Sequence, residues 1–291
     1  MLDVPIGIIH SSWGGSNVEP WMSREVLEQY QEVDLSNVSE DTKINHTQVA
    51  LFNAMIKPLI PFTLKGFLWY QGESNRLKPE EYKILFPAMV KDWRTRWGNQ
   101  NAPFYFTQIA PFNYGGNSFF QDVENSAFIR EAQLHCVDSI SNSGIAITLD
   151  IGDSLSIHPP RKKEVADRLL GLALNKTYGF EGLNTESPVY KSLEVQEGKA
   201  LLKFDNAPDG LYVYDDLKGF EIAGEDHIFY PAEAQIEKRK DVLVWSDKVP
   251  NPVAVRYAWS NYVDGTLFGV NLLPISSFRT DDWTDAIRFK E

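Results

Sequence analysis

Three short polar segments stand where a β-strand is predicted to end, and each carries groups that suit acid–base chemistry or ligand binding. Residues 11–16 read SSWGGS, residues 71–75 read QGESN, and residues 150–158 begin with DIGD and end at His158. Histidine is the usual general base because its pKa lies near neutrality, and paired glycines let backbone N–H groups approach a ligand. In open parallel sheets, ligands bind beyond the carboxyl ends of the strands. The sequence therefore predicts an α/β enzyme with a polar, histidine-centred site.

Each segment also has a purely structural interpretation. Gly14 and Gly15 are typical of a tight strand-to-helix turn, and Glu73 lies in a run that is typical of a capped helix start. His158, which follows Asp153, is consistent with a structural histidine as well as with a base. These residues alone do not name a reaction.

The other acidic and histidine residues give weaker signals. Asp150, Asp153 and His158 form an alternative metal-ligand set, but their spacing does not demand one, and we expect neither a metal nor a cofactor. The sequence contains no HExxH, EF-hand, Walker A or GxGxxG motif. The remaining histidines fall on predicted helices, in a β-rich loop or at the end of the first strand: His46, His135, His227 and His10.

The elements that would position these segments alternate strand with helix along residues 1–182. Apolar runs predict strands, and apolar spacing near 3.6 residues predicts helices. This alternation favours a parallel sheet that is covered on both faces. The predicted strands cover residues 5–10, 65–74 (running into a turn), 103–112 and 144–153, and the predicted helices cover residues 45–59, 79–97, 126–136 and 162–178.

Residues 183–291 have a different texture. Short β-like runs are separated by turns of Gly, Pro, Asn and Asp, and no long helix is predicted. This pattern is typical of a β-sandwich or jelly roll. We therefore expect two closely packed domains, an α/β core over residues 1–182 and a β-rich domain over residues 183–291.

Composition excludes several classes of protein. The chain has 291 residues, and 43% of them are hydrophobic, which is ordinary for a globular protein. Its net charge of -12 argues against nucleic acid and anionic membranes as partners. The single cysteine, Cys136, is expected to be a small buried hydrophobe. No run approaches the roughly 18 apolar residues of a membrane span, and we expect no signal peptide because the chain opens without a basic n-region or a long apolar h-region.

Taken in order, several segments resemble the sialate O-acetylesterases. The resemblance covers almost the whole chain, and WYQGESN together with IHP is its most specific pair. The matching blocks are VPIGIIHSSWGGSNVEPWMS, LFNAMIKPLIPFTLKGFLWYQGESN, REAQ, DIGD with IHP and VADRL, GFEIAGEDHIFYPAEA, VRYAW and LLPISSFRTDDW.

This resemblance implies a flavodoxin-like, three-layer α/β/α core of the SGNH-hydrolase type and a serine esterase that removes O-acetyl groups from sugars such as sialic acid. By position, His158 matches the catalytic base, and Gly14 and Gly15 match the block whose backbone N–H contributes to the oxyanion hole. Gln71 and Glu73 match the block that supplies further oxyanion and acid-side contacts. Ester cleavage needs such a set: a nucleophile, a base and donors for the tetrahedral oxyanion.

The chain departs from the family pattern in two places. The family's nucleophile lies in a GQSNM block upstream of the first matching segment, and Ser12 and Ser74 fall in blocks with other roles. We therefore expect this polypeptide alone to be inactive, or to be completed by a separate upstream chain. The family's DxxH pattern is also altered, because Leu155 and Ser156 occupy the nearest positions before His158; Asp153 or Glu73 is the remaining candidate for the orienting carboxylate.

Two alternatives stay open. One is an acetylesterase for plant polysaccharides such as acetylxylan. The other is a non-catalytic carbohydrate-binding remnant, in which aromatic residues of the β-rich half stack on sugars, although at strand spacing such residues are more often core. The expected partner is an O-acetylated sugar, and the family resemblance implies a secreted, periplasmic or lysosomal setting.

Overall fold

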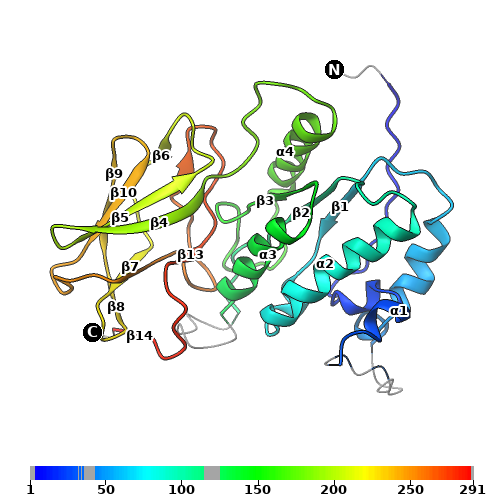
Figure 1. The fold of residues 1–291 in the computed structure, drawn as a ribbon, viewed down its shortest axis with the longest axis horizontal. Coiled ribbons are helices and arrows are strands. Elements are labelled where there is room, and N and C mark those ends of the chain that lie inside the picture. Colours follow the sequence, from blue (N-terminus) through cyan, green and yellow to red (C-terminus); the bar gives the residue numbers. More distant parts are fainter. Residues whose placement is uncertain (1–3, 32, 34, 36–42, 115–124, 290–291) are drawn as a thin grey trace.

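The computed structural model describes residues 4–31, 33, 35, 43–114 and 125–289, and it shows a mixed α/β molecule with several sheets (Figure 1). Helices gather with one small sheet in the first half of the chain, and strands dominate from residue 189 onward. This arrangement confirms the predicted α/β class. The domain boundary near residue 182 stays a prediction.

The first sheet contains three parallel strands, β1 (Phe67–Tyr70), β2 (Phe104–Thr107) and β3 (Ser143–Ala146), in the order β1-β2-β3. Successive side chains of a strand point to opposite faces. On β2, Phe104 and Phe106 pack in the core that contains Phe86 and Ile129. These two residues belong to α2 (Pro79–Arg96) and α3 (Ala127–Ser139), so both helices cover that face.

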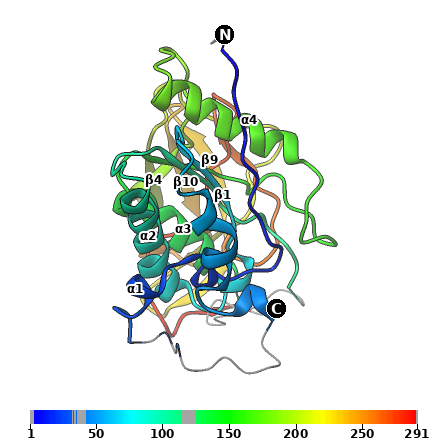
Figure 2. The same cartoon turned by 90° about the vertical axis from the view of Figure 1, so that its right-hand side faces the viewer.

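The opposite face of the sheet is covered by α4 (Lys162–Leu172) and the π-helical turn η6 (Ala173–Thr177) that continues it (Figures 1 and 2). Tyr105, between the two phenylalanines of β2, points to this side, and its hydroxyl lies 2.7 Å from Thr177 Oγ1. Gly144 on β3 allows the close approach, because a Cβ there would lie 2.9 Å from a methyl group of Leu172. Helices therefore cover both faces, as the strand–helix alternation predicted.

The predicted strand at residues 5–10 is wrong. These residues are extended but form no ladder with any described strand, and their apolar side chains are exposed, with Ile8 88% accessible. A strand needs backbone partners as well as apolar side chains. After this segment, the chain forms η1 (Glu19–Trp21) and α1 (Arg24–Leu27), which pack into the same core as α2.

The predicted helix at residues 45–59 is broken into short turns. The described elements are η2 (Ile44–His46), the π-helical turn η3 (Phe52–Ile56) and η4 (Lys57–Leu59). Val49 lies in the left-handed region at φ 69°, which is unfavourable for a β-branched residue and interrupts a regular helix. The short 3-10 turn η5 (Glu73–Asn75) follows β1.

The β-rich half contains three further sheets. Their strand orders are β4-β5-β10-β9, β13-β11-β7-β8-β14 and β12-β6. Buried apolar side chains of this half form one main core around Leu202, Val244 and Val255. The strands are β4 (Val189–Gln196), β5 (Lys199–Asp205), β6 (Leu211–Val213), β7 (Phe220–Ala223), β8 (Ile228–Pro231), β9 (Glu233–Glu237), β10 (Asp241–Trp245), β11 (Ala254–Tyr257), β12 (Leu267–Gly269), β13 (Phe278–Arg279) and β14 (Ile287–Arg288).

Two further sequence predictions concern burial. Cys136 is buried on α3, as predicted. Among the described residues, no helix combines the length and apolar character that crossing a membrane requires.

Candidate active site

The predicted site segments meet at one edge of the parallel sheet. Because β1 and β3 run in the same direction, the segments that follow them leave the sheet on the same side. Residues 71–75 follow β1, and residues 147–158 follow β3 and lead into α4. The first segment, residues 11–16, reaches the same edge through hydrogen bonds.

A buried amide network joins the first segment to the second. Gln71 Nε2 donates to the Ser16 carbonyl (2.9 Å) and to Asn75 Oδ1 (2.7 Å). Asn75 Oδ1 also accepts the Val18 amide (2.9 Å), while Asn75 Nδ2 donates to Glu19 Oε2 (3.0 Å). Both donor hydrogens of the Gln71 side chain are thereby engaged, so this residue fixes the position of the neighbouring loop.

The two glycines of the first segment form an exposed turn that is held from one side. Asn45 Nδ2 donates to the carbonyls of Gly14 (3.0 Å) and Gly15 (2.8 Å), and His46 Nε2 lies 2.9 Å from the Gly15 carbonyl. Gly15 has φ 64°, a conformation that favours glycine. These contacts fix the turn through its carbonyl groups.

Glu73 lies at the meeting point of the loops. Its side chain is half-buried, and burial raises the pKa of the carboxyl group, while its own backbone N–H and the nearby Lys162 and His158 lower it. The Lys162 ammonium lies 4.9 Å from the ring centre of Tyr70, the last residue of β1. The loop before α4 and the first residue of that helix therefore bring a histidine and a lysine toward the carboxylate that follows β1.

His158 and Asp153 lie in the same loop but do not share a hydrogen bond among the described residues. Asp153 Oδ1 instead accepts the backbone amides of Leu155 (2.8 Å) and Ser156 (3.3 Å), which shapes the loop. The His158 side chain is exposed at the surface of this loop. Asp153 supports the loop that carries the histidine.

Asp150 belongs to a separate ion pair. Its carboxylate accepts two hydrogen bonds from the Arg168 guanidinium, at 2.8 and 2.6 Å. Within the described part of the chain, no three His, Cys, Asp or Glu side chains are grouped as a metal site. The alternative ligand set of Asp150, Asp153 and His158 is therefore not assembled in this structure.

The sequence interpretation missed two residues that hold the site. Asn75, only 1% exposed, joins both segments, and Gln133 on α3 donates to the Gln71 carbonyl (2.9 Å) and accepts the Ile109 amide (2.9 Å). Gln133 belongs to the REAQ block and Asn75 to WYQGESN, so both motifs were visible. Their roles were not, because hydrogen bonds between distant residues leave no local pattern.

One further pair has nucleophile-and-base geometry. Ser12 Oγ lies 2.7 Å from His10 Nε2, and both side chains are on the exposed N-terminal segment. A serine within hydrogen-bond distance of an imidazole is the basic requirement for an activated hydroxyl. The described residues bring no carboxylate into a hydrogen bond with His10.

Comparison with known proteins gives a consistent result. The family model for carbohydrate esterases described as sialic acid-specific acetylesterases matches residues 1–167, which is more than half of the chain. Human sialate O-acetylesterase is 31% identical over 280 residues, and the mouse enzyme is 29% identical over 306 residues. These alignments cover 90% of this chain but 53% and 56% of the two relatives, so the chain spans about half the length of the curated relatives it matches.

A solved structure agrees with these relatives. A carbohydrate acetylesterase from Xanthomonas citri superimposes with a TM-score of 0.86 and 39% sequence identity, covering 97% of this chain and 62% of that one. The family resemblance drawn from the sequence blocks is thus confirmed. The chain belongs to the sialic acid-specific acetylesterase family of carbohydrate esterases.

Proposed function

We propose that this protein hydrolyses O-acetyl esters on sugars, using a flavodoxin-like, three-layer SGNH-hydrolase core. Membership of the carbohydrate esterase family and the similarity to the Xanthomonas citri acetylesterase support the reaction class. The parallel sheet with helices on both faces supports the core assignment. The single observation that carries the proposal is the convergence of His158, Lys162 and Glu73 at the carboxyl ends of the parallel strands.

In this mechanism His158 is the general base. It takes the proton of an attacking serine hydroxyl and returns it to the leaving sugar oxygen, which requires a group that changes charge near neutral pH. The exposed position of His158 leaves its ring accessible to a substrate. Asp153 supports this role by fixing the loop through the Leu155 and Ser156 amides.

The turn at Gly14 and Gly15 is assigned to the oxyanion hole, which stabilises the negative charge that develops on the ester oxygen. Backbone N–H groups that are fixed before the reaction stabilise negative charge without reorganisation. The carbonyls of this turn are already bound by Asn45, which limits its freedom to rotate. Gln71 then acts by positioning, because both of its amide hydrogens hold Ser16 and Asn75.

Glu73 is assigned to the acid side of the site. Because burial raises the pKa of its carboxyl group, the protonated form is favoured more than in a solvated glutamate. The neighbouring Lys162 and His158 lower this pKa and so favour the ionised carboxylate. Glu73 therefore lies close enough to His158 for the two side chains to interact electrostatically, which supports its assignment beside the catalytic base.

The test measures acetate release by the protein as purified from its source, with any chain that co-purifies. The substrates are p-nitrophenyl acetate, O-acetylated sialic acid and acetylated xylan. We expect hydrolysis of the aryl ester, and we expect His158→Ala to lower kcat by about a thousandfold or more. His135→Ala, a change at an exposed histidine of α3, is the matched control and should retain activity.

Labelling with a fluorophosphonate, followed by peptide mapping, locates the attacking serine. Full activity in His158→Ala would contradict the assignment of the base. Labelling of Ser12 together with loss of activity in His10→Ala would move the catalytic pair to the N-terminal segment. Absence of hydrolysis on all three substrates would contradict the proposed function itself.

A further inference from the structure

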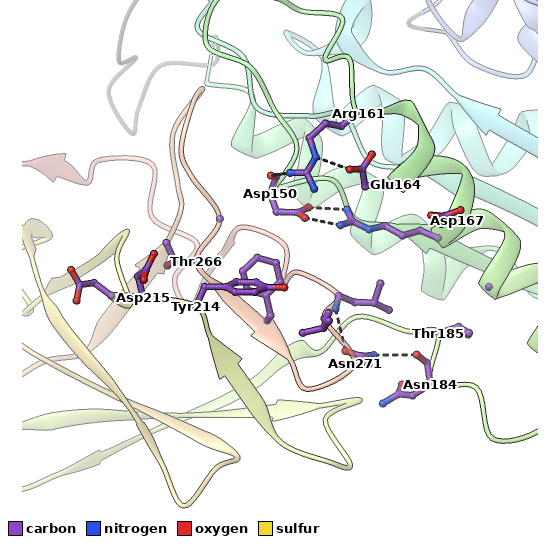
Figure 3. Close-up of a pocket in the computed structure, with 17 residues that line it drawn as sticks. Asp150, Arg161, Glu164, Asp167, Asn184, Thr185, Tyr214, Asp215, Thr266 and Asn271 are labelled. Atoms are coloured by element: carbon purple, nitrogen blue, oxygen red, sulfur yellow. Dashed lines mark hydrogen bonds and ion pairs between the residues drawn. The ribbon is translucent and has the colours of Figure 1, made fainter.

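A cleft lies beside the candidate active site, between α4 and the β-rich half. Its volume is about 870 Å³, which is large enough for several sugar rings. One wall comes from α4, the other from the segment after β6 and from β12 with its following turn (Figure 3). Residues 184–185, which connect the two halves of the chain, complete the lining.

An aromatic side chain stands in the middle of this cleft. Tyr214 is 59% exposed, yet its ring is held edge-on against Phe268 (5.1 Å between centroids) and Tyr212 (5.0 Å). In Figure 3 the ring lies between Thr266 and Asn271, below the Asp150 ion pair. A ring that is fixed by its neighbours and exposed on a face is suited to stacking on the apolar face of a sugar.

The charges that line the cleft indicate what kind of sugar fits. Two guanidinium groups line it, and both are paired: Arg168 with Asp150, and Arg161 with Glu164 (2.8 Å). The carboxylates of the lining outnumber them, because Asp167, Asp215 and Asp216 also contribute. Lys163 pairs with Asp167 and Lys218 with Asp216, so these cations too are already engaged. Carboxylates accept hydrogen bonds from sugar hydroxyl groups but repel an anionic sugar such as sialic acid.

The start of α4 connects this cleft with the candidate active site. Arg161 donates to the Asp150 carbonyl (3.1 Å) and lines the cleft, whereas the next residue, Lys162, lies over Tyr70 on the side of Glu73. His158 lies three residues before Arg161. The loop of residues 150–161 therefore borders both the cleft, through Asp150 and Arg161, and the candidate active site, through His158.

We propose that this cleft binds the neutral sugar units of an acetylated oligosaccharide whose ester lies in the candidate active site. The inference rests on the proposed function, and it assigns the substrate to a neutral acetylated glycan rather than to an isolated sialic acid. The aromatic wall supplies the stacking surface, and the carboxylates of the lining supply hydrogen-bond acceptors for sugar hydroxyl groups.

Calorimetric titration tests binding without any need for turnover. Xylohexaose and cellohexaose are the neutral probes, and 3′-sialyllactose is the anionic probe. We expect the neutral probes to bind and Tyr214→Ala to weaken their binding by about tenfold, since stacking is lost. Tyr214→Phe retains the ring and should bind like the wild type. Trp245→Ala, which removes a half-exposed aromatic residue of β10 outside the cleft, is the matched control.

Kinetics with acetylated xylo-oligosaccharides provide the second readout. We expect Tyr214→Ala to raise KM for these substrates by about tenfold, while hydrolysis of p-nitrophenyl acetate, which has no sugar ring to stack, stays unchanged. Failure of both neutral probes to bind, equal binding by Tyr214→Ala, or preferential binding of sialyllactose would overturn the inference. Binding of the neutral probes without acetate release from any ester would instead contradict the proposed function and leave the cleft as a sugar-binding site.

Discussion

At the scale of single residues, the site depends on a carboxyl group in an unfavourable place. Glu73 is half-buried where β1 ends, and burial raises the pKa of its carboxyl group despite the nearby Lys162 and His158. A raised native pKa means that the folded protein binds this proton more readily than the unfolded chain does. The resulting stabilisation is present below the unfolded pKa and is lost as the pH rises through the folded pKa.

Glu73→Gln should therefore stabilise the fold at neutral pH. The amide retains the size of the side chain but carries no charge to desolvate, so we expect its melting temperature to exceed that of the wild type at pH 7–8. The difference should shrink toward pH 4, where the wild-type glutamate is protonated. Thermal unfolding at several pH values measures this, with the exposed Glu80→Gln as a control. A difference that is constant across the range would contradict the prediction.

At the same scale, the positions of the polar site residues were easier to predict from the sequence than their hydrogen-bond partners. The polar segments at 71–75 and 150–158 were predictable because polar runs after apolar strands fall at one edge of a parallel sheet. The hydrogen bonds that hold these segments were not predictable, because they join residues far apart in the sequence. Gln71 donates to the Ser16 carbonyl, and Gln133 donates to the Gln71 carbonyl. Such contacts are created by the tertiary fold, and local composition does not encode them.

At the scale of secondary structure, periodicity was reliable where an element packs along its whole length. The helix predicted at residues 79–97 is present as α2 over Pro79–Arg96, because its apolar stripe faces a continuous core. Residues 5–10 have the apolar character of a strand without a backbone partner, and residues 45–59 have helical spacing interrupted at Val49. Apolar spacing does not specify a hydrogen-bond partner or a backbone conformation.

The turn after β1 shows how tightly an element can be constrained. Gly72 has φ 157°, and a Cβ there would lie 2.6 Å from Gln133 Nε2 and 2.7 Å from a methyl group of Ile109. Gly72→Ala should therefore displace the loop that carries Glu73, lowering the free energy of unfolding by about 1–3 kcal/mol and reducing esterase activity. Chemical denaturation and aryl acetate hydrolysis measure the two effects.

Gly7→Ala is the matched control for this change, because a Cβ at Gly7 meets no atom within 4 Å and its backbone conformation is open to other residues. We expect it to leave stability and activity unchanged. If Gly72→Ala were as stable and as active as the control, the loop would be able to accommodate a methyl group, and the prediction would be wrong.

At the scale of the whole molecule, buried polar contacts join α3 to the β-rich half. Arg130 on α3 is fully buried and donates to Ser277 Oγ (3.0 Å) and to the Ser260 carbonyl (2.6 Å). Burial lowers the pKa of this guanidinium to about 10, which still leaves it charged at neutral pH. Its neighbour Glu131 accepts two hydrogen bonds from Arg279 of β13, both at 2.9 Å. These contacts hold the β-rich half against the helical half.

The pair of Glu131 and Arg279 provides a direct measure of this coupling. Both side chains are mostly buried, at 14% and 16% exposure, so removing one leaves the other without a partner where water reaches it poorly. In a cycle of Glu131→Ala, Arg279→Ala and the double variant, urea unfolding should give a coupling free energy of about 1–3 kcal/mol. The exposed pair of Lys191 and Asp205 within the β-rich half is the matched control and should give less than about 1 kcal/mol. Additive effects at Glu131 and Arg279 would mean that this ion pair adds nothing to the joining of the two halves, which would then rest on the Arg130 hydrogen bonds and on apolar packing.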